Sequence, residues 1–154
     1  MPLYQHTLRL CESSNMSGGG ITLVYKALHR IASWLYKVEI PYGVTIGPGL
    51  FIGHPYCITI NPHATIGSNC NIHKGVTVGQ ENRGVRKGSP TIGDCVWIGV
   101  NSTIVGKITI GDDVLIAPNS YVNCDVPSHS IVFGNPCIIK HKENATEGYV
   151  NNKV

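Results

Sequence analysis

From residue 40 onward an aliphatic side chain recurs at every sixth position of the chain. The series is interrupted twice, by a two-residue slip after Ile52 and by an insertion after Val78. It comprises Ile40, Ile46, Ile52, Ile60, Ile66, Ile72, Val78, Ile92, Ile98, Ile104, Ile110, Ile116 and Val122. A short repeat of fixed period indicates a solenoid, in which each unit packs only on its neighbours.

Two further positions of each hexad follow the same pattern. The fifth residue is small or apolar, except Tyr56 in the slipped hexad, and the second and fourth are often Gly, Asn or Asp. Gly, Asn and Asp tolerate a left-handed backbone, so these positions can form the corners of a coil. Because side chains alternate along a strand, the first and fifth residues should face inward. Three hexads then close one triangular coil, so the sequence predicts an all-β fold, a single-stranded parallel β-helix of about four coils.

The segments that flank the repeat have a different character. Residues 1–20 are polar and Gly-rich and are expected to form a loose arm, and residues 140–154 to form a polar, frayed tail. Residues 21–38 predict a short helix with one apolar face, formed by Ile21, Val24, Leu28, Ile31, Leu35 and Val38. We expect this face to cap the open edge of the first coil. Basic residues on the other face leave contact with a membrane surface as an alternative. The predicted units are therefore 1–39, 40–139 and 140–154.

Composition narrows the class of protein. The chain has 154 residues, of which 42% are hydrophobic and 14% charged, with a net charge of +3. That length fits one domain, and these values argue against disorder and against a nucleic-acid-binding protein. No apolar run is long enough for a membrane span and no secretory signal is evident. We therefore expect a cytoplasmic protein whose six cysteines are reduced thiols.

The two interruptions of the repeat are where chemistry is expected, since loops on a rigid scaffold carry functional sites. The slip at Gly53–Cys57 contains His54. The insertion, a protruding loop within 80–90, contains Arg83, Arg86 and Lys87. That loop is either a solvated surface loop or a flap whose cations position an anionic ligand.

Three segments carry a family resemblance: IGPGLFIGH at 46–54, ITINPHATIG at 58–67 and DVPSHSIVFGNPCII at 125–139. Together with the hexads they resemble the catalytic domain of serine acetyltransferases and related bacterial-type hexapeptide-repeat O-acyltransferases, over roughly residues 39–139. The resemblance implies a left-handed β-helix. It also implies acetyl-CoA as cosubstrate, a small hydroxyl acceptor, and a homotrimer with active sites between subunits.

By this resemblance His54 is the catalytic histidine and Glu39 the carboxylate that orients it, where typical members have Asp. A neutral imidazole can take the acceptor's hydroxyl proton, and a carboxylate on the other ring nitrogen fixes the tautomer. Glu39 lies less than one coil before His54, so the pair needs side-chain reach or a bulge to meet. The alternatives are a solvated loop histidine and a surface carboxylate at the helix end.

The resemblance also places the coenzyme. Small residues let the pantetheine arm approach the backbone, and the matching positions are Gly79, Gly99, Val100, Ala117 and Pro118. Lys140 and the loop cations could meet the phosphates. The other histidines are expected on the surface, and their spacing does not suit the three-histidine zinc site of related β-helix enzymes, so we expect no metal.

The acceptor is the most open question. Gly53 stands where typical serine acetyltransferases have Asp, and Gly88 and Ser89 stand where they have an Arg-His pair for the serine carboxylate. Arg83, Arg86, Lys87 and Ser89 are the candidate acceptor-binding residues. We therefore expect a sugar hydroxyl of a surface polysaccharide or its precursor, with serine as the alternative. A non-catalytic β-helix assembly module is the competing class.

Overall fold

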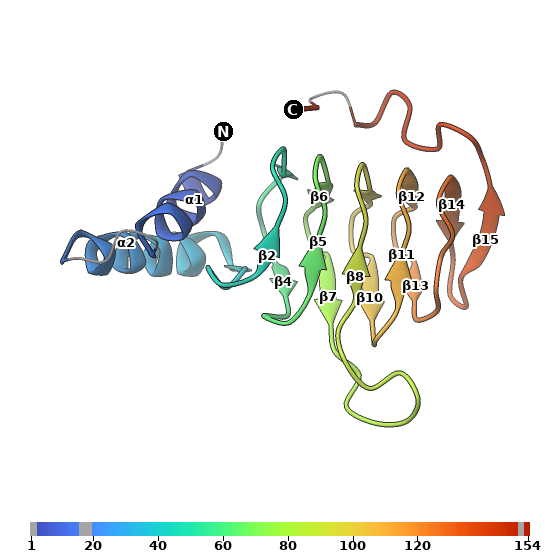
Figure 1. Cartoon of the computed structure of the whole chain (residues 1–154), viewed down its shortest axis with the longest axis horizontal. Helices are drawn as coiled ribbons and strands as arrows, with labels where there is room; N and C mark the ends of the chain where they lie inside the picture. The colour runs from blue at the N-terminus through green and yellow to red at the C-terminus, as the bar shows by residue number, and fades with distance from the viewer. Residues whose placement is uncertain (1–2, 16–19, 151–152) are drawn as a thin grey trace.

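A computed structural model describes residues 3–15, 20–150 and 153–154. Helices α1 (Leu3–Asn15) and α2 (Gly20–Tyr36) lie at one end of a solenoid of short strands (Figure 1). The strands are β1 (Val38–Glu39), β2 (Thr45–Ile46), β3 (Phe51–Gly53), β4 (Ile58–Ile60), β5 (Thr65–Ile66), β6 (Asn71–His73), β7 (Thr77–Gly79), β8 (Thr91–Ile92), β9 (Trp97–Ile98), β10 (Thr103–Val105), β11 (Thr109–Ile110), β12 (Val114–Ile116), β13 (Tyr121–Val122), β14 (Ser130–Phe133) and β15 (Ile138–His141).

The strands stack into three sheets, one for each side of the coil. Their orders are β1-β4-β7-β10-β13, β11-β8-β5-β2 and β15-β14-β12-β9-β6-β3. Every pairing is parallel except that of β14 with the final strand β15. The predicted left-handed β-helix is confirmed. It is one coil longer than the hexads indicate, because β14 adds a level after the six-residue period has ended.

The core consists of the residues that the repeat predicts. All the inward aliphatic positions are buried except Ile46, which is partly exposed, and the fifth-position residues from Val44 to Val126 are buried except Tyr56 of the slipped hexad. Most predicted corners, such as Asn69 and Asp113, have a left-handed backbone, although Gly43 and Asp125 do not. Gly67 shows why glycine recurs, since a Cβ there would lie 2.5 Å from the Gly93 carbonyl oxygen on the next coil.

The N-terminal segment is not the loose arm that its polarity predicts, at least over residues 3–15; residues 16–19 lie outside the described part. Tyr4 and Leu8 of α1 are fully buried in the main core. The Tyr4 hydroxyl accepts a hydrogen bond from the Ile40 amide at 3.0 Å, and Arg9 donates to the Gly47 carbonyl at 2.8 Å. Helix α1 therefore caps the first coil.

Helix α2 forms where expected but presents the opposite face to the protein. His29 and Ala32 are buried, and the His29 ring lies 3.2 Å from both the Thr7 hydroxyl of α1 and the Ile40 carbonyl. The helical part of the predicted core-facing stripe, from Ile21 to Leu35, is exposed instead. The prediction that this stripe caps the coil is therefore wrong. Within the described residues, neither helix is long and apolar enough to cross a membrane.

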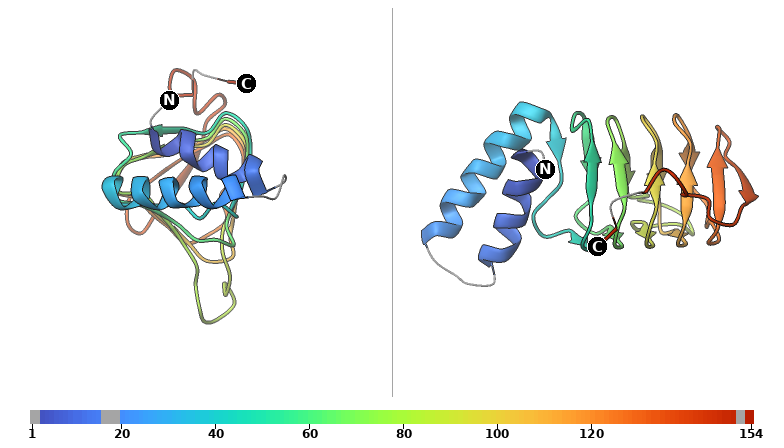
Figure 2. Two further views of the ribbon diagram at one scale, coloured as in Figure 1. Left: turned by 90° about the vertical axis from the view of Figure 1, so that its left-hand side faces the viewer. Right: turned by 90° about the horizontal axis from the view of Figure 1, so that it is seen from above.

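The C-terminal tail is also more ordered than predicted. After β15 the chain turns back along the solenoid toward its N-terminal coils (Figure 2). Ala145, Thr146 and Val150 are buried, and the Tyr149 ring packs edge-on against Trp97 at 5.0 Å. The Val154 amide donates to Asn69 at 2.8 Å, so the tail is held at both ends.

Candidate functional site

His54 lies at the corner that follows β3, where the repeat slips by two residues. Its side chain is exposed, and its backbone is left-handed with φ of 54°. Cys57, at the other end of the slip, has φ of 53°. Regular corners such as Asn69 and Asp113 have the same left-handed backbone, so it is the two-residue slip that sets this corner apart. This corner therefore departs from the regular repeat and exposes the His54 imidazole to solvent.

A second histidine lies beside this corner on the next coil. Gly53 pairs with His73, and a Cβ at position 53 would lie 2.6 Å from His73 Nδ1. The His73 ring packs on Trp97 at 4.7 Å, and its Nε2 is buried without a hydrogen-bond partner. Burial, and to a smaller extent the charge of His54, lower the pKa of His73 below its usual value. A neutral imidazole therefore occupies the space beside His54.

Sequence reasoning assigned His73 to the surface, and only the stacking of coils reveals its place. It sits twenty residues after Gly53, a spacing that the slip hides from the regular hexad count. The combination of a glycine and a histidine at paired positions of adjacent coils was the available signal. Any side chain larger than hydrogen at position 53 would displace this ring.

Glu39, the predicted partner of His54, lies elsewhere in this structure. It sits in β1, opposite Thr59 of β4, and lines a pocket of about 560 Å³ beside α2 together with Lys26 and Arg30. No hydrogen bond or ion pair joins the Glu39 carboxylate to the His54 imidazole. The pairing of these two residues stays a prediction.

Four of the six predicted coenzyme positions share one edge of the solenoid with His54. Strands β3, β6, β9 and β12 are neighbours in one sheet, and the residues that follow them are His54, Lys74, Gly99 and Ala117. The Gly99 amide donates to the Ile116 carbonyl at 2.8 Å, and a Cβ on Gly99 would lie 2.6 Å from the nitrogen of Pro118. We call the line of residues that follow these four strands the His54 edge. Val100 and Pro118 also lie along it.

The other two coenzyme positions lie away from this edge. Gly79 ends β7, in a different sheet. Lys140 lies in β15, and its Nζ is 5.8 Å from the centre of the Phe133 ring. Neither is brought beside His54 by the fold of one chain.

The loop Gln80–Ser89 protrudes from the solenoid as predicted (Figure 1). Two backbone hydrogen bonds of 2.9 Å between Glu81 and Gly88 close its neck. The Arg86 guanidinium donates to the Asn123 carbonyl, and Ser89 donates to Asn61 at 3.0 Å. Arg86 and Ser89 are therefore bonded to the scaffold, although Arg86, like Arg83 and Lys87, is exposed.

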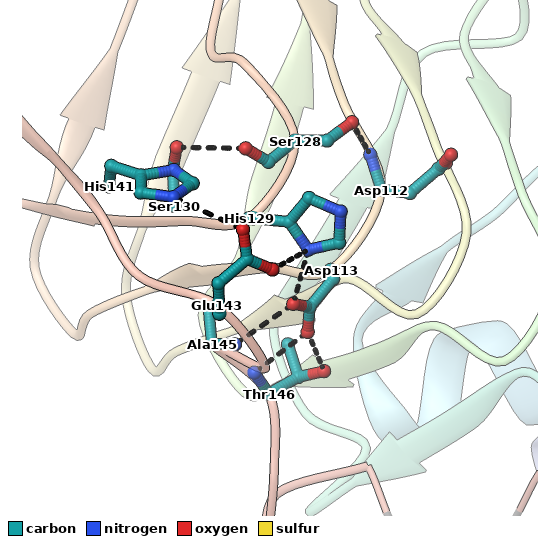
Figure 3. Close-up of polar contacts among 9 residues, drawn as sticks. All are labelled: Asp112, Asp113, Ser128, His129, Ser130, His141, Glu143, Ala145 and Thr146. Atoms are coloured by element: carbon teal, nitrogen blue, oxygen red, sulfur yellow. Dashed lines mark hydrogen bonds and ion pairs between the residues drawn. The ribbon is translucent and has the colours of Figure 1, made fainter.

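A histidine–carboxylate pair away from His54 joins Asp113 and His129 at 2.9 Å (Figure 3). Partial burial acts to raise the pKa of Asp113, but hydrogen bonds from Thr146, His129 and Ala145 outweigh it and lower that pKa to about 2. The hydrogen bond to Asp113 raises the pKa of His129. Because Thr146 and Ala145 belong to the tail, this cluster holds the tail to the coil and is a structural pair.

The described residues contain no group of three or more His, Cys, Asp or Glu side chains that could hold a metal ion. The cysteines among them are free thiols, and two of these, Cys124 and Cys137, have their sulfur atoms 3.6 Å apart. The chemistry available at the His54 edge is thus that of an exposed imidazole beside small residues.

Comparison with known proteins agrees with this architecture. Residues 89–124 match the family model "Bacterial transferase hexapeptide (six repeats)". The chain is 36% identical over 112 residues to the serine acetyltransferase of Helicobacter pylori strain 26695, a match that covers 73% of this chain and 66% of that protein.

Solved structures give the same picture. The structure of Neisseria gonorrhoeae serine acetyltransferase in complex with serine superposes with a TM-score of 0.74 and 31% identity, over 89% of this chain and 55% of that one. A serine acetyltransferase in complex with CoA superposes with a TM-score of 0.74 and 25% identity, again over 89% and 55%. The chain therefore spans about half to two thirds of the length of these proteins.

Proposed function

Because this chain belongs to the bacterial hexapeptide-repeat transferases, we propose that it moves an acetyl group from acetyl-CoA to the hydroxyl of a small acceptor. The observation that carries the proposal is the exposed imidazole of His54, held in a left-handed corner on the same edge as Gly99 and Ala117. The CoA complex of a similar protein supports the choice of donor.

The proposed chemistry is general-base catalysis. The acceptor oxygen attacks the thioester carbonyl carbon while His54 takes the hydroxyl proton. The tetrahedral intermediate then breaks its C–S bond, and the departing CoA sulfur receives that proton from the imidazolium. Glu39 would orient His54 from the other ring nitrogen, which requires its side chain to move from its present position.

The coenzyme would lie along the His54 edge. Strand spacing of about 4.8 Å puts Gly99 two levels, or roughly 10 Å, from His54 along that edge. Gly79 and Lys140 lie off this edge, so they would contribute only from a neighbouring subunit. We therefore propose a homotrimer with the site between subunits. A cytoplasmic location follows from the donor, which is a cytoplasmic metabolite.

The relatives favour serine as the acceptor. From the sequence alone, serine is the alternative and a sugar hydroxyl is the first expectation. Both the Helicobacter and Neisseria proteins are serine acetyltransferases, and the Neisseria structure contains serine. Arg83 and Lys87 project from the loop and could meet a carboxylate. We propose serine O-acetylation as the leading function.

A sugar hydroxyl is the second candidate, and the pair formed by Gly53 and His73 favours it. The ring of His73 fills the space that an Asp side chain at position 53 would need. A neutral imidazole offers an ammonium group none of the attraction that a carboxylate would give. Gly88 and Ser89 likewise supply no cation for a carboxylate, so these three positions favour an uncharged acceptor.

The first experiment measures release of the CoA thiol from acetyl-CoA with serine and with a panel of sugars. His54→Ala should lower kcat/KM by about 100-fold or more, since general-base catalysis contributes roughly 10²–10⁴-fold. His63→Ala is the matched control, because His63 is exposed but lies away from the His54 edge. Equal turnover by both variants would refute the catalytic role of His54.

The second experiment separates the two acceptors. The variant Ser89→His restores one member of the pair that serine acetyltransferases typically carry and leaves Gly88, which has φ of 136°, unchanged. If serine is a poor acceptor of the wild type, its KM should fall in this variant while the rate with a sugar does not rise. If the wild type already turns over serine with a low KM and ignores every sugar, the sugar proposal is rejected.

A further inference from the structure

The outer face of helix α2 is apolar along its length and is largely exposed in the described chain. It carries Ile21, Leu23, Val24, Leu28, Ile31, Trp34 and Leu35, whose side chains are between 46% and 72% exposed. On the opposite side, His29 and Ala32 face α1 and the first coil. A large contiguous apolar patch of this kind marks a binding surface. We call it the α2 outer face.

Charge lines one flank of this face. Lys26 and Arg30 fall on the same side of the helix, four residues apart, and Lys37 directly follows its last residue; α2 contains no Asp or Glu. Lys37 Nζ lies 4.4 Å from the centre of the Trp34 ring, and Lys26 Nζ lies 4.9 Å from that of Tyr42. An apolar face with a cationic flank and an interfacial tryptophan is typical of helices that lie on anionic membranes.

The position of α2 lets it meet a flat surface. The two helices lie together at the N-terminal end of the solenoid, and the protruding loop and the tail lie elsewhere (Figures 1 and 2). With 17 residues the helix is about 25 Å long, so it can lie in an interface but is not a span.

A second copy of this chain fits the face less well than a membrane does. In an antiparallel two-fold pair of α2 helices, symmetry places the flank of each helix on the same side. Lys26 and Arg30 of the two copies would then lie on the same side of the pair, with no acidic residue of α2 among them. Anionic headgroups would satisfy the same cations while the acyl chains take the apolar side chains.

We propose that the α2 outer face binds the surface of a membrane that contains anionic lipids, with the helix parallel to the bilayer plane. The pocket beside α2 is bordered by Lys26 and Arg30 but also by Glu39, so it adds no clear preference for an anion. The proposal is independent of acetyl transfer, since it requires neither His54 nor the His54 edge.

The test is flotation of the full chain with vesicles of phosphatidylcholine alone and of phosphatidylcholine mixed with phosphatidylglycerol. Wild type should float with the mixed vesicles, and binding should fall when salt is raised to about 0.5 M, which screens the cations. Lys26→Gln/Arg30→Gln should weaken binding by roughly five-fold per charge. Lys142→Gln, on an exposed lysine of the tail, is the matched control and should leave binding unchanged.

The apolar side chains are tested by Ile31→Ser/Trp34→Ser, which should reduce binding at least ten-fold with the fold intact by circular dichroism. Val85→Ser is its control, because Val85 is 99% exposed on the loop. Trp34 also reports insertion directly, since its emission should shift to the blue with mixed vesicles and the shift should vanish in Trp34→Phe. Trp97 is packed between His73 and Tyr149 and should not respond.

Three outcomes would overturn the proposal. One is no flotation of wild type with mixed vesicles, and another is equal flotation of wild type and Ile31→Ser/Trp34→Ser. The third is that neither protein floats and that Ile31→Ser/Trp34→Ser halves the mass measured in solution. That result would assign the face to a second copy of the chain. None of these measurements uses substrate, so each can fail while the His54 experiments succeed.

Discussion

Helices α1 and α2 lie side by side at the same end of the solenoid. The polar helix packs on the first coil, whereas the apolar helix exposes most of its apolar side chains. Helix α1 is polar, yet Tyr4 and Leu8 are fully buried and Arg9 bonds to the first coil. Helix α2 is strongly apolar, yet its apolar stripe faces away from the protein. The difference shows that a capping helix is selected by the few contacts it makes with the coil end, and not by its mean hydropathy.

The coil end explains this choice. The first coil exposes the carbonyl groups of Ile40, Ile46, Gly47 and Leu50, and each accepts a hydrogen bond from a side chain of α1. Buried backbone groups must be hydrogen-bonded, so the cap needs Tyr, Gln and Arg as much as Leu. A purely apolar helix face such as that of α2 would leave those carbonyls unsatisfied.

The largest expected effect is at Leu8. Leu8→Ala removes a fully buried side chain from the main core and should lower the free energy of unfolding by about 2–5 kcal/mol. Leu23→Ala makes the same change on the exposed face of α2 and should alter it by less than about 0.5 kcal/mol. Urea denaturation of the two variants measures the contrast. Equal losses would mean that α1 is not the cap.

The next effect concerns the tail, another polar segment that the fold holds in place. Asp113→Asn keeps the shape of the side chain but cannot accept all the hydrogen bonds from Thr146, Ala145 and His129. We expect a loss of roughly 2 kcal/mol in the free energy of unfolding, since hydrogen bonds to charged groups are worth about 1.5–3 kcal/mol. Proteolysis should also cleave the variant within residues 142–150 faster than the wild type.

The same cluster predicts a dependence on pH with a definite sign. The folded-state pKa of Asp113 is about 2, below its ordinary 3.8, so its stabilisation is present above pH 3.8 and is lost as pH falls toward 2. The pKa of His129 is raised, so its contribution is present below pH 6.5 and is lost as pH rises through the folded-state value. Acid unfolding of Asp113→Asn should lack the component near pH 2–4. An unchanged acid limb in the variant would contradict this assignment.

The solenoid was predictable because each inward residue repeats a local rule, and thirteen repetitions leave little ambiguity. The faces of α2 and the course of the tail depend on contacts between residues such as Asp113 and Thr146, which lie 33 apart in the chain. His54 could be found because it breaks the period. His73 was missed, since its position beside His54 follows only from stacking the slipped coil on the next one, where it pairs with Gly53.

The smallest effect is expected on the outer face of α2, and adjacent residues provide the sharpest comparison. Ile31 is 56% exposed whereas Ala32 is 2% exposed, although both lie in the middle of one helix. Ile31→Gln should change the free energy of unfolding by less than about 0.5 kcal/mol, because Gln has a similar helix propensity and the site is in solvent. Ala32→Gln must force a larger, polar side chain against α1 and should cost more than about 2 kcal/mol. Thermal denaturation of the two variants at low protein concentration measures both values. If Ile31→Gln proves as destabilising as Ala32→Gln, the apolar stripe contributes to the folded core and cannot be the free surface that vesicle binding requires.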